Sequence, residues 1–167
     1  MTETFSFNAE SLDKVKFELS KYPEDRKQSA VMSLLDIAQR QNGGWLSKSA
    51  IEHVASHLEM PYIKVYEIVT FYSMYYTTPV GKYFVQVCTT TPCWLKGSDE
   101  VVKACKETIS EKQNELSNDG LFSWMEVECL GACVNAPLVQ INDDFYEDLN
   151  YENTKNVLQS FIDRNPS

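Results

Sequence analysis

Four of the five cysteines form two close pairs whose spacing could support metal or redox chemistry. Four residues separate Cys88 from Cys93, three separate Cys129 from Cys133, and 35 residues lie between the pairs. Four thiolates brought together from two loops can bind a zinc ion or an iron–sulfur cluster, whereas thiols in an oxidising compartment form disulfides. The spacing therefore leaves four candidates: a zinc site, an iron–sulfur cluster, two disulfides and a thiol redox pair.

The length and the start of the chain argue against disulfides. A chain of 167 residues buries about 70% of its unfolded surface and needs no disulfide to hold its core. The first ten residues lack the basic and apolar regions of a signal peptide and the Arg-rich character of a transit peptide. We therefore expect a cytosolic chain with reduced or metal-bound thiols. A thioredoxin-type redox pair needs Cys-x-x-Cys, and neither pair has that spacing.

The composition indicates protein partners. Acidic residues outnumber basic ones by 24 to 15, giving a formal charge of −9, and no Lys/Arg cluster offers a surface for nucleic acid. The longest apolar stretch, residues 63–76, is too short and too polar to span a membrane. The six glycines form no phosphate-binding fingerprint, and no Ser/His/Asp nucleophile set stands out. We thus expect no catalytic residue and no independent active site in this chain.

The residues between the paired cysteines favour an anionic iron–sulfur cluster over zinc, without excluding zinc. The segment Thr89–Thr91 supplies backbone N–H groups and hydroxyls, and Leu130–Ala132 brings small residues that allow close approach. Neither intervening loop contains an acidic residue, although the chain as a whole is acidic. Paired zinc ligands most often have two residues between them. A structural zinc-binding adaptor therefore stays open as a function of a different class.

Helical periodicity dominates the chain up to about residue 78. We expect four helices: one with Ser11 as its N-cap, a longer one from about Glu24, a third capped by Ser47, and a fourth with Pro61 in its first turn. The apolar residues that mark these helices, of which Ile51, Val54, Ala55 and Leu58 are expected inward, are Leu12, Val15, Leu19, Ala30, Val31, Leu34, Leu35, Ala38, Ile51, Val54, Ala55, Leu58, Ile63, Val65, Tyr66 and Val69.

Strand-like segments follow, and two of them lead into the cysteine pairs. We expect strands at Tyr83–Val87 and Leu121–Glu128, which end at Cys88 and Cys129. Between them the pattern predicts a helix, whose apolar face holds Val101, Val102, Cys105 and Ile109. Parallel strands joined through a helix end at the same edge of a sheet, so both cysteine pairs should meet there.

The rest of the chain completes an α+β fold. The segments Pro137–Ile141 and Phe145–Glu147 flank a polar turn and predict a hairpin, and a last helix is expected over Asn153–Ile162. We expect an N-terminal helical bundle over residues 1–80 and an α/β domain over residues 81–167.

Three segments resemble a known family. The runs QVCTTTPCWLKGSDE and VECLGACVNAPLVQINDDFYEDL, with MPYIKVYEIVTFYSMYY before the first strand, strongly resemble the thioredoxin-like [2Fe–2S] ferredoxin subunit of respiratory complex I, known as the 24-kDa type. The likeness covers most of the chain. It implies a thioredoxin-like α/β domain with one [2Fe–2S] cluster, whose ligands are Cys88, Cys93, Cys129 and Cys133.

The resemblance also implies a function, partners and a location. The family's subunit transfers single electrons in the proton-translocating NADH–quinone oxidoreductase. Its partners are the flavoprotein subunit that binds NADH and FMN, and the large iron–sulfur subunit. The expected location is the cytoplasmic face of a bacterial inner membrane, as a peripheral subunit, or the matrix side in mitochondria. Related NAD-linked formate dehydrogenases and hydrogenases contain an equivalent subunit. A subunit of such an enzyme therefore stays open as an alternative.

Other residues with chemical potential have simpler explanations. Cys105 has no partner at ligand spacing and is expected to pack in the core. His53 and His57 form HVASH without the Glu of a zinc protease, so packing or surface roles are expected. Trp94 follows Cys93, where it would either shield a cluster or contact another protein. An aromatic run is expected in core packing, in a seam between the two parts or in a partner surface; it comprises Phe71, Tyr72, Tyr75 and Tyr76.

Overall fold

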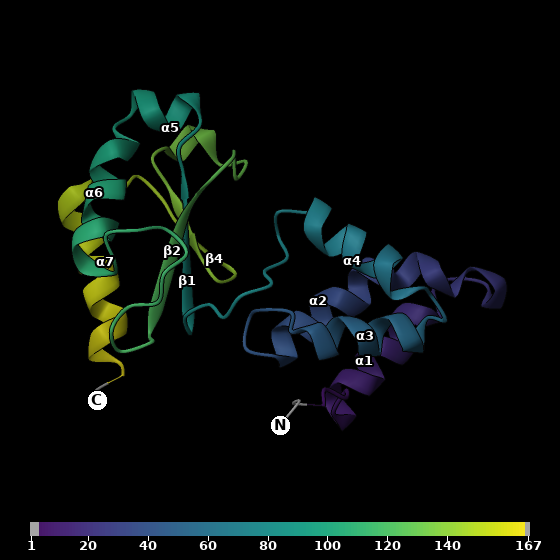
Figure 1. Cartoon of the computed structure of the whole chain (residues 1–167). Helices are drawn as coiled ribbons and strands as arrows, with labels where there is room; N and C mark the ends of the chain where they lie inside the picture. The colour runs from purple at the N-terminus through teal and green to yellow at the C-terminus, as the bar shows by residue number, and fades with distance from the viewer. Residues whose placement is uncertain (1–3, 166–167) are drawn as a thin grey trace. The chain divides into compact units, whose positions relative to one another are not determined.

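Helices and strands are segregated along the chain in the computed structural model, which describes residues 4–165. Two units divide between Pro79 and Val80; the first contains helices, and the second contains a mixed sheet with helices (Figure 1). The expected α+β class, with helices before the sheet, is confirmed. The assignment of residues 1–80 as a helical region and of residues 81–167 as a separate α/β domain stays a prediction. The signal-peptide prediction depends partly on residues 1–3, which lie outside the described range.

The first unit is built from short amphipathic helices. Its elements are α1 (Ala9–Leu19), the 3-10 helix η1 (Glu24–Ala30), α2 (Val31–Gln41), α3 (Lys48–His57) and α4 (Tyr62–Phe71). Ser47 caps α3 as expected, because its hydroxyl accepts a hydrogen bond from the Ala50 N–H at 3.2 Å. The N-cap predicted for α1 was wrong. Asn8 caps this helix, and its side chain accepts a hydrogen bond from the Ser11 N–H at 2.8 Å.

The predicted helix from Glu24 was also wrong in its start. Residues 24–30 form η1, in which Arg26 has a non-helical φ of −125°, and the α-helix begins only at Val31. This segment is mostly polar, so it has little apolar surface with which packing could stabilise an α-helix. In α4 the structure buries Val65 and Val69, whereas Ile63 and Tyr66 are exposed. Buried side chains that form the core of this unit include Val15, Leu34, Leu35, Leu46, Ala50, Ile51, Val54 and Leu58.

The second unit contains a four-stranded sheet. Its strands are β1 (Tyr83–Cys88), β2 (Phe122–Val127), β3 (Val139–Ile141) and β4 (Asp144–Tyr146), in the order β2-β1-β3-β4. β1 and β2 are parallel, and the other neighbouring pairs are antiparallel. A parallel pair needs a crossover connection, which helices supply here. The predicted strands and hairpin are therefore confirmed, although Asp144, expected in the turn, is the first residue of β4.

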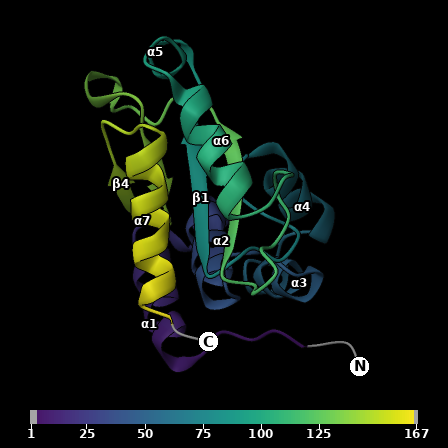
Figure 2. The same ribbon diagram turned by 90° about the vertical axis from the view of Figure 1, so that its left-hand side faces the viewer.

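Three helices accompany this sheet: α5 (Thr91–Leu95), α6 (Ser98–Thr108) and α7 (Tyr151–Asp163). α6 and α7 lie side by side against the same face of the sheet (Figure 2). Trp124 is fully buried in β2, and its Nε1 donates a hydrogen bond to the Ser110 carbonyl at 2.8 Å. Cys105 belongs to this core, as predicted. Within residues 4–165, no helix combines the length and the apolar character that a membrane crossing requires.

Candidate metal centre

The parallel strands bring both cysteine pairs to one end of the sheet. Cys88 is the last residue of β1 and lies opposite Val127, the last residue of β2. Cys129 follows two residues later, in the loop after β2. α5, which holds Cys93, lies at the same end (Figure 1). The expected meeting of the two pairs at the carboxyl ends of parallel strands is thus confirmed.

A short helix that the sequence analysis missed positions Cys93. α5 has only five residues, too few for a hydrophobic periodicity to show. Its signal in the sequence is Thr90 at the N-cap, followed by Pro92 early in the helix, where proline is favoured. The helix turns Cys93 inward. Cys93 and Cys88 are both fully buried. They form a small apolar cluster with Ala136 and Leu138.

The second pair lies in an exposed loop. The Sγ atoms of Cys129 and Cys133 are 3.4 Å apart, and both side chains are exposed. The Gly131 N–H donates a hydrogen bond to the Cys129 Sγ at 3.4 Å. Gly131 has a φ of +88°, a left-handed conformation that favours glycine and lets this loop turn tightly. The centre therefore combines one buried and one accessible pair of thiols.

Hydrogen bonds and burial affect the two buried thiols differently. Burial by itself would raise the pKa of the Cys88 thiol, but hydrogen bonds to its sulfur outweigh burial and lower the pKa. They come from the Thr90 hydroxyl, from Cys93, and from the backbone N–H groups of Thr90 and Leu130. Burial, followed by the hydrogen bond with Cys88, raises the pKa of Cys93 to about 11. Cys88 is thus the buried thiol whose surroundings best stabilise a thiolate.

Electrostatic coupling connects the exposed pair with the buried pair. The hydrogen bond with Cys129, followed by burial and by the charges of Cys129 and Cys88, raises the pKa of Cys133. The charge of Cys133 in turn helps to raise the pKa of Cys93. Even so, the described part of the chain contains no group of three or more Cys, His, Asp or Glu side chains already arranged around a metal position. The thiols are gathered as two neighbouring pairs rather than as one closed site.

The donor chemistry of these pairs fits a four-thiolate centre. All four sulfurs are free, and backbone N–H groups point at Cys88 and Cys129. No acidic residue lies within either intervening loop, so neither loop places a carboxylate between its two thiols. Soft thiolates bind both iron–sulfur clusters and zinc, and the donor set by itself fits either.

Cys105 and the two histidines pack within their own units. Burial raises the pKa of the Cys105 thiol to about 12, which keeps it protonated and inert. In the helical unit, the ring of Phe7 packs against His53 and His57, with centroid distances of 5.0 and 6.0 Å. The predicted core packing of Cys105 and the predicted packing or surface roles of the histidines are therefore confirmed.

The aromatic residues divide into buried and exposed ones. Tyr75 is buried in the helical unit, and its hydroxyl donates a hydrogen bond to the Met32 carbonyl at 2.9 Å. Core packing is thus confirmed for Tyr75. The Phe71 side chain is 79% exposed and that of Trp94 is 57% exposed. Their roles as contact residues stay predictions.

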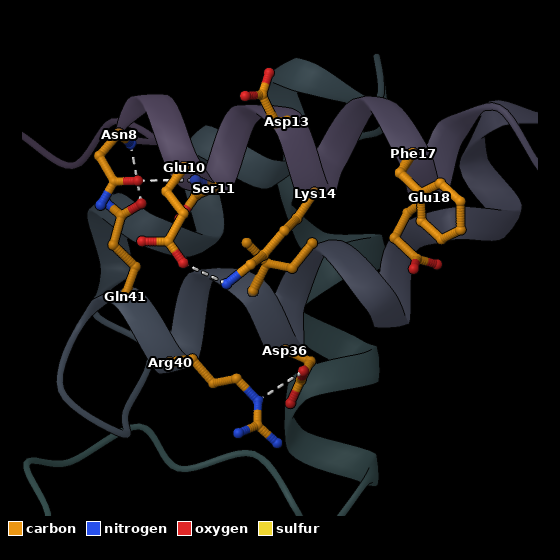
Figure 3. A pocket seen from close by; sticks show the side chains of 11 residues that line it. Asn8, Glu10, Ser11, Asp13, Lys14, Phe17, Glu18, Asp36, Arg40 and Gln41 are labelled. Atoms are coloured by element: carbon orange, nitrogen blue, oxygen red, sulfur yellow. Dashed lines mark hydrogen bonds and ion pairs between the residues drawn. The ribbon is translucent and has the colours of Figure 1, made fainter.

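A groove of about 720 Å³ lies in the helical unit between α1 and α2 (Figure 3). Its charged groups are already paired: Glu10 with Lys14 at 2.7 Å, and Asp36 with Arg40 at 2.9 Å. The other two carboxylates that line it also pair with lysines. Because these charges satisfy one another, the groove is a weaker candidate for ligand chemistry than the cysteine loops.

Comparisons with known proteins match the part of the chain that contains both cysteine pairs. Residues 15–162 match the model of a family described as thioredoxin-like [2Fe-2S] ferredoxin. The chain is 54% identical to a subunit of the NADH-quinone oxidoreductase of Rickettsia typhi, over 95% of this chain and 94% of that protein. It is 49% identical to NADH dehydrogenase [ubiquinone] flavoprotein 2, mitochondrial, of Dictyostelium discoideum, over 98% of this chain and 66% of that protein.

A solved structure has a similar fold. An NAD+-reducing [NiFe]-hydrogenase, crystallised in its air-oxidized state, superposes on 80% of this chain with a TM-score of 0.66 and 17% sequence identity. The chain spans about a quarter of that hydrogenase chain, of which 23% is covered. At this identity the likeness concerns the fold alone.

Proposed function

Because the chain belongs to the thioredoxin-like [2Fe–2S] ferredoxin family, we propose that Cys88, Cys93, Cys129 and Cys133 hold one [2Fe–2S] cluster. The chain is an electron-transfer subunit of NADH–quinone oxidoreductase, respiratory complex I, of the 24-kDa type. One observation carries the ligand assignment: the register of β1 and β2, which brings the two pairs of free thiols to the same end of the sheet.

The protein would contribute burial, hydrogen bonds and charge to this centre. When bound, a [2Fe–2S] cluster supplies one-electron transfer. Cys88 and Cys93 would hold it on the buried side, where the fully buried sulfurs exclude water. The Gly131 N–H, which donates to Cys129, would stabilise negative charge on the accessible side. The chain's own residues therefore adjust the ease of reduction, while the cofactor carries the reactivity.

Hydride chemistry would belong to a partner. The sequence contains no phosphate-binding fingerprint, so we propose that NADH and FMN bind to the flavoprotein subunit of the complex. The large iron–sulfur subunit is a second proposed partner. Exposed apolar side chains flank the cysteines: Trp94 at 57%, Leu95 at 72% and Val134 at 95% exposure. Large exposed apolar residues of this kind are typical of protein contact surfaces, which supports a partner contact at the cysteine end.

The proposed location follows from membership of the complex. The chain would be a peripheral subunit on the cytoplasmic face of a bacterial inner membrane, or on the matrix side in mitochondria. Relatives in Rickettsia and the mitochondrial protein of Dictyostelium discoideum are consistent with either setting. Fractionation of the native membranes, followed by a salt wash, would test this location: the chain should sediment with the other subunits of the complex.

Metal analysis of the anaerobically purified chain tests the cofactor. We expect two iron and two sulfide ions per chain, visible absorption, and an EPR signal that appears on reduction. A colourless protein with one zinc ion and no sulfide would overturn the electron-transfer proposal in favour of the structural zinc adaptor.

The second candidate function is that of the equivalent subunit in a related hydrogenase or formate dehydrogenase. The hydrogenase structure is 17% identical and supports the fold alone. The relatives at 54% and 49% identity are a subunit of an NADH-quinone oxidoreductase and an NADH dehydrogenase [ubiquinone] flavoprotein. The sequence relatives therefore favour complex I. Co-purification of quinone-reductase subunits with the tagged chain is the expected result, and recovery of hydrogenase subunits in their place would reverse the assignment.

A further inference from the structure

The Thr90 side chain has an unusual hydrogen-bond partner for a residue at a helix N-terminus. It occupies the N-cap position of α5, with extended backbone angles of φ −68° and ψ 166°. A threonine there normally accepts a hydrogen bond from a backbone N–H in the first helical turn. The Thr90 side chain makes no such bond. Its Oγ1 lies instead 3.3 Å from the Cys88 Sγ.

Other polar N-cap residues of this chain do cap their helices. The side chains of Asn8, Ser47 and Asn150 each accept a hydrogen bond from the backbone N–H three residues later. Capping stabilises a helix, so its loss at α5 is a cost. A residue that gives up a favourable local interaction, such as a helix cap, for a bond to a neighbouring group is expected at a functional site. The partner that Thr90 gains is the sulfur of a proposed cluster ligand.

The position of Cys88 makes this bond consequential. Cys88 is fully buried, and in such surroundings a hydrogen bond acts more strongly on charge than it does in water. A thiolate sulfur is an acceptor, so with Cys88 in that form the Thr90 hydroxyl is the donor. The adjacent Thr91 is exposed, and within residues 4–165 no hydrogen bond joins its side chain to a cysteine sulfur. Of these two hydroxyls, that of Thr90 is therefore the one placed to act on the site.

We propose that Thr90 is a positioning residue that raises the reduction potential of the centre through its hydrogen bond to Cys88. This inference rests on the proposed function. Uptake of one electron changes the formal charge of a [2Fe–2S] cluster and its four thiolates from −2 to −3, with no proton transferred to Cys88. A hydrogen bond to a ligand sulfur strengthens as the negative charge on that sulfur grows, so it stabilises the reduced form more than the oxidised form.

The test compares three variants of the full chain with the parent. Thr90→Val keeps the β-branched shape and removes the hydroxyl, Thr90→Ser keeps the hydroxyl, and Thr91→Val removes the neighbouring hydroxyl. Iron and sulfide content are measured first, and the midpoint potential is then measured by an EPR-monitored redox titration. We expect Thr90→Val to shift the potential to more negative values at unchanged iron content. Thr90→Ser and Thr91→Val should stay close to the parent.

The outcomes separate this inference from the proposed function. A parent chain without iron and sulfide would refute the cluster itself. A loaded parent with the same potential in Thr90→Val, or an equal shift in Thr91→Val, would overturn only the role of Thr90. If Thr90→Val does not load, Thr90→Ala removes the hydroxyl without adding a methyl group and provides the same comparison. Failure of both hydroxyl-free variants to load, beside normal loading of Thr90→Ser, would make the hydroxyl an assembly requirement and contradict the inference.

Discussion

Cys88 and Val127 lie opposite each other as the last residues of the parallel strands β1 and β2. This register sets the position of the second cysteine pair relative to Cys88, because Cys129 follows Val127 by two residues. A shift of one residue would turn the side chains of a strand to the opposite face of the sheet. Val85 and Val87, which alternate along β1, are both fully buried in the observed register.

Replacement of a proposed ligand should abolish or strongly perturb the cluster. In Cys93→Ser, a buried thiolate donor is replaced by a hydroxyl that binds iron poorly at neutral pH. We expect a large loss of iron and sulfide, or a changed EPR spectrum. Cys105→Ala is the matched control, since Cys105 is buried in the core and belongs to neither pair. Its spectrum should equal that of the parent. A cluster lost in the Cys105 variant and retained in the Cys93 variant would overturn the ligand assignment.

Truncation of Leu95 should weaken the partner complex. The side chain is 72% exposed beside the proposed cysteine centre, where an apolar contact with the flavoprotein subunit is proposed. An apolar side chain in an interface contributes on the order of 1 kcal/mol, so Leu95→Ala should weaken binding about tenfold or less. Leu116→Ala, at an exposed leucine that precedes the other end of β2, is the control. Equal affinities of the two variants, measured by calorimetry with the purified flavoprotein, would refute this contact.

Gly81→Ala should destabilise the sheet unit strongly. A Cβ at Gly81 would clash with the backbone carbon of Phe122, and backbone cannot move aside as a flexible side chain can. We expect a loss of about 3 kcal/mol in the free energy of unfolding, as for severe overpacking. Gly120 has open space around it but a φ of +68°, so Gly120→Ala should cost only about 1–2 kcal/mol. Urea unfolding would measure both, and an equal cost at the two positions would contradict the predicted clash.

His53 should make the stability of the helical unit depend on pH. Burial, followed by the charge of His57, lowers the pKa of His53 in the folded chain. The unfolded chain, with an ordinary histidine pKa of about 6.5, therefore binds more protons at mildly acidic pH. The contribution of His53 is fully present above about pH 6.5 and is lost as the pH falls through the lower folded-state pKa.

A neutral replacement isolates this effect from the carboxylates. His53→Gln cannot take up the proton, so its free energy of unfolding should fall less than that of the parent between about pH 7.5 and pH 5.5. Urea unfolding at both pH values gives the comparison. The same pH dependence in the two proteins would show that the pKa of His53 does not differ between the folded and the unfolded chain.

Local signals predicted much of the fold. Ser47 was recognisable as an N-cap because a hydroxyl before an apolar helical face has a specific backbone partner. The strands before Cys88 and Cys129 were recognisable from short β-branched and aromatic runs. The errors came where local signals compete or are weak: Asn8 and Ser11 are both acceptable caps, and α5 is too short to show a period. The exposure of Ile63 could not be predicted, because an apolar residue at helical spacing does not reveal which face packs.

The sequence by itself determined the donor chemistry of the proposed centre: two pairs of cysteines, acid-free loops between their members, and a family pattern around them. These properties belong to residue types and spacings, which are local. Tertiary structure decided that Cys88 and Cys93 are buried while Cys129 and Cys133 are exposed, and that the hydroxyl of Thr90 turns to Cys88 rather than to its own helix. Burial and hydrogen-bond partners depend on strand register and on packing between distant segments, which spacing along the chain does not specify.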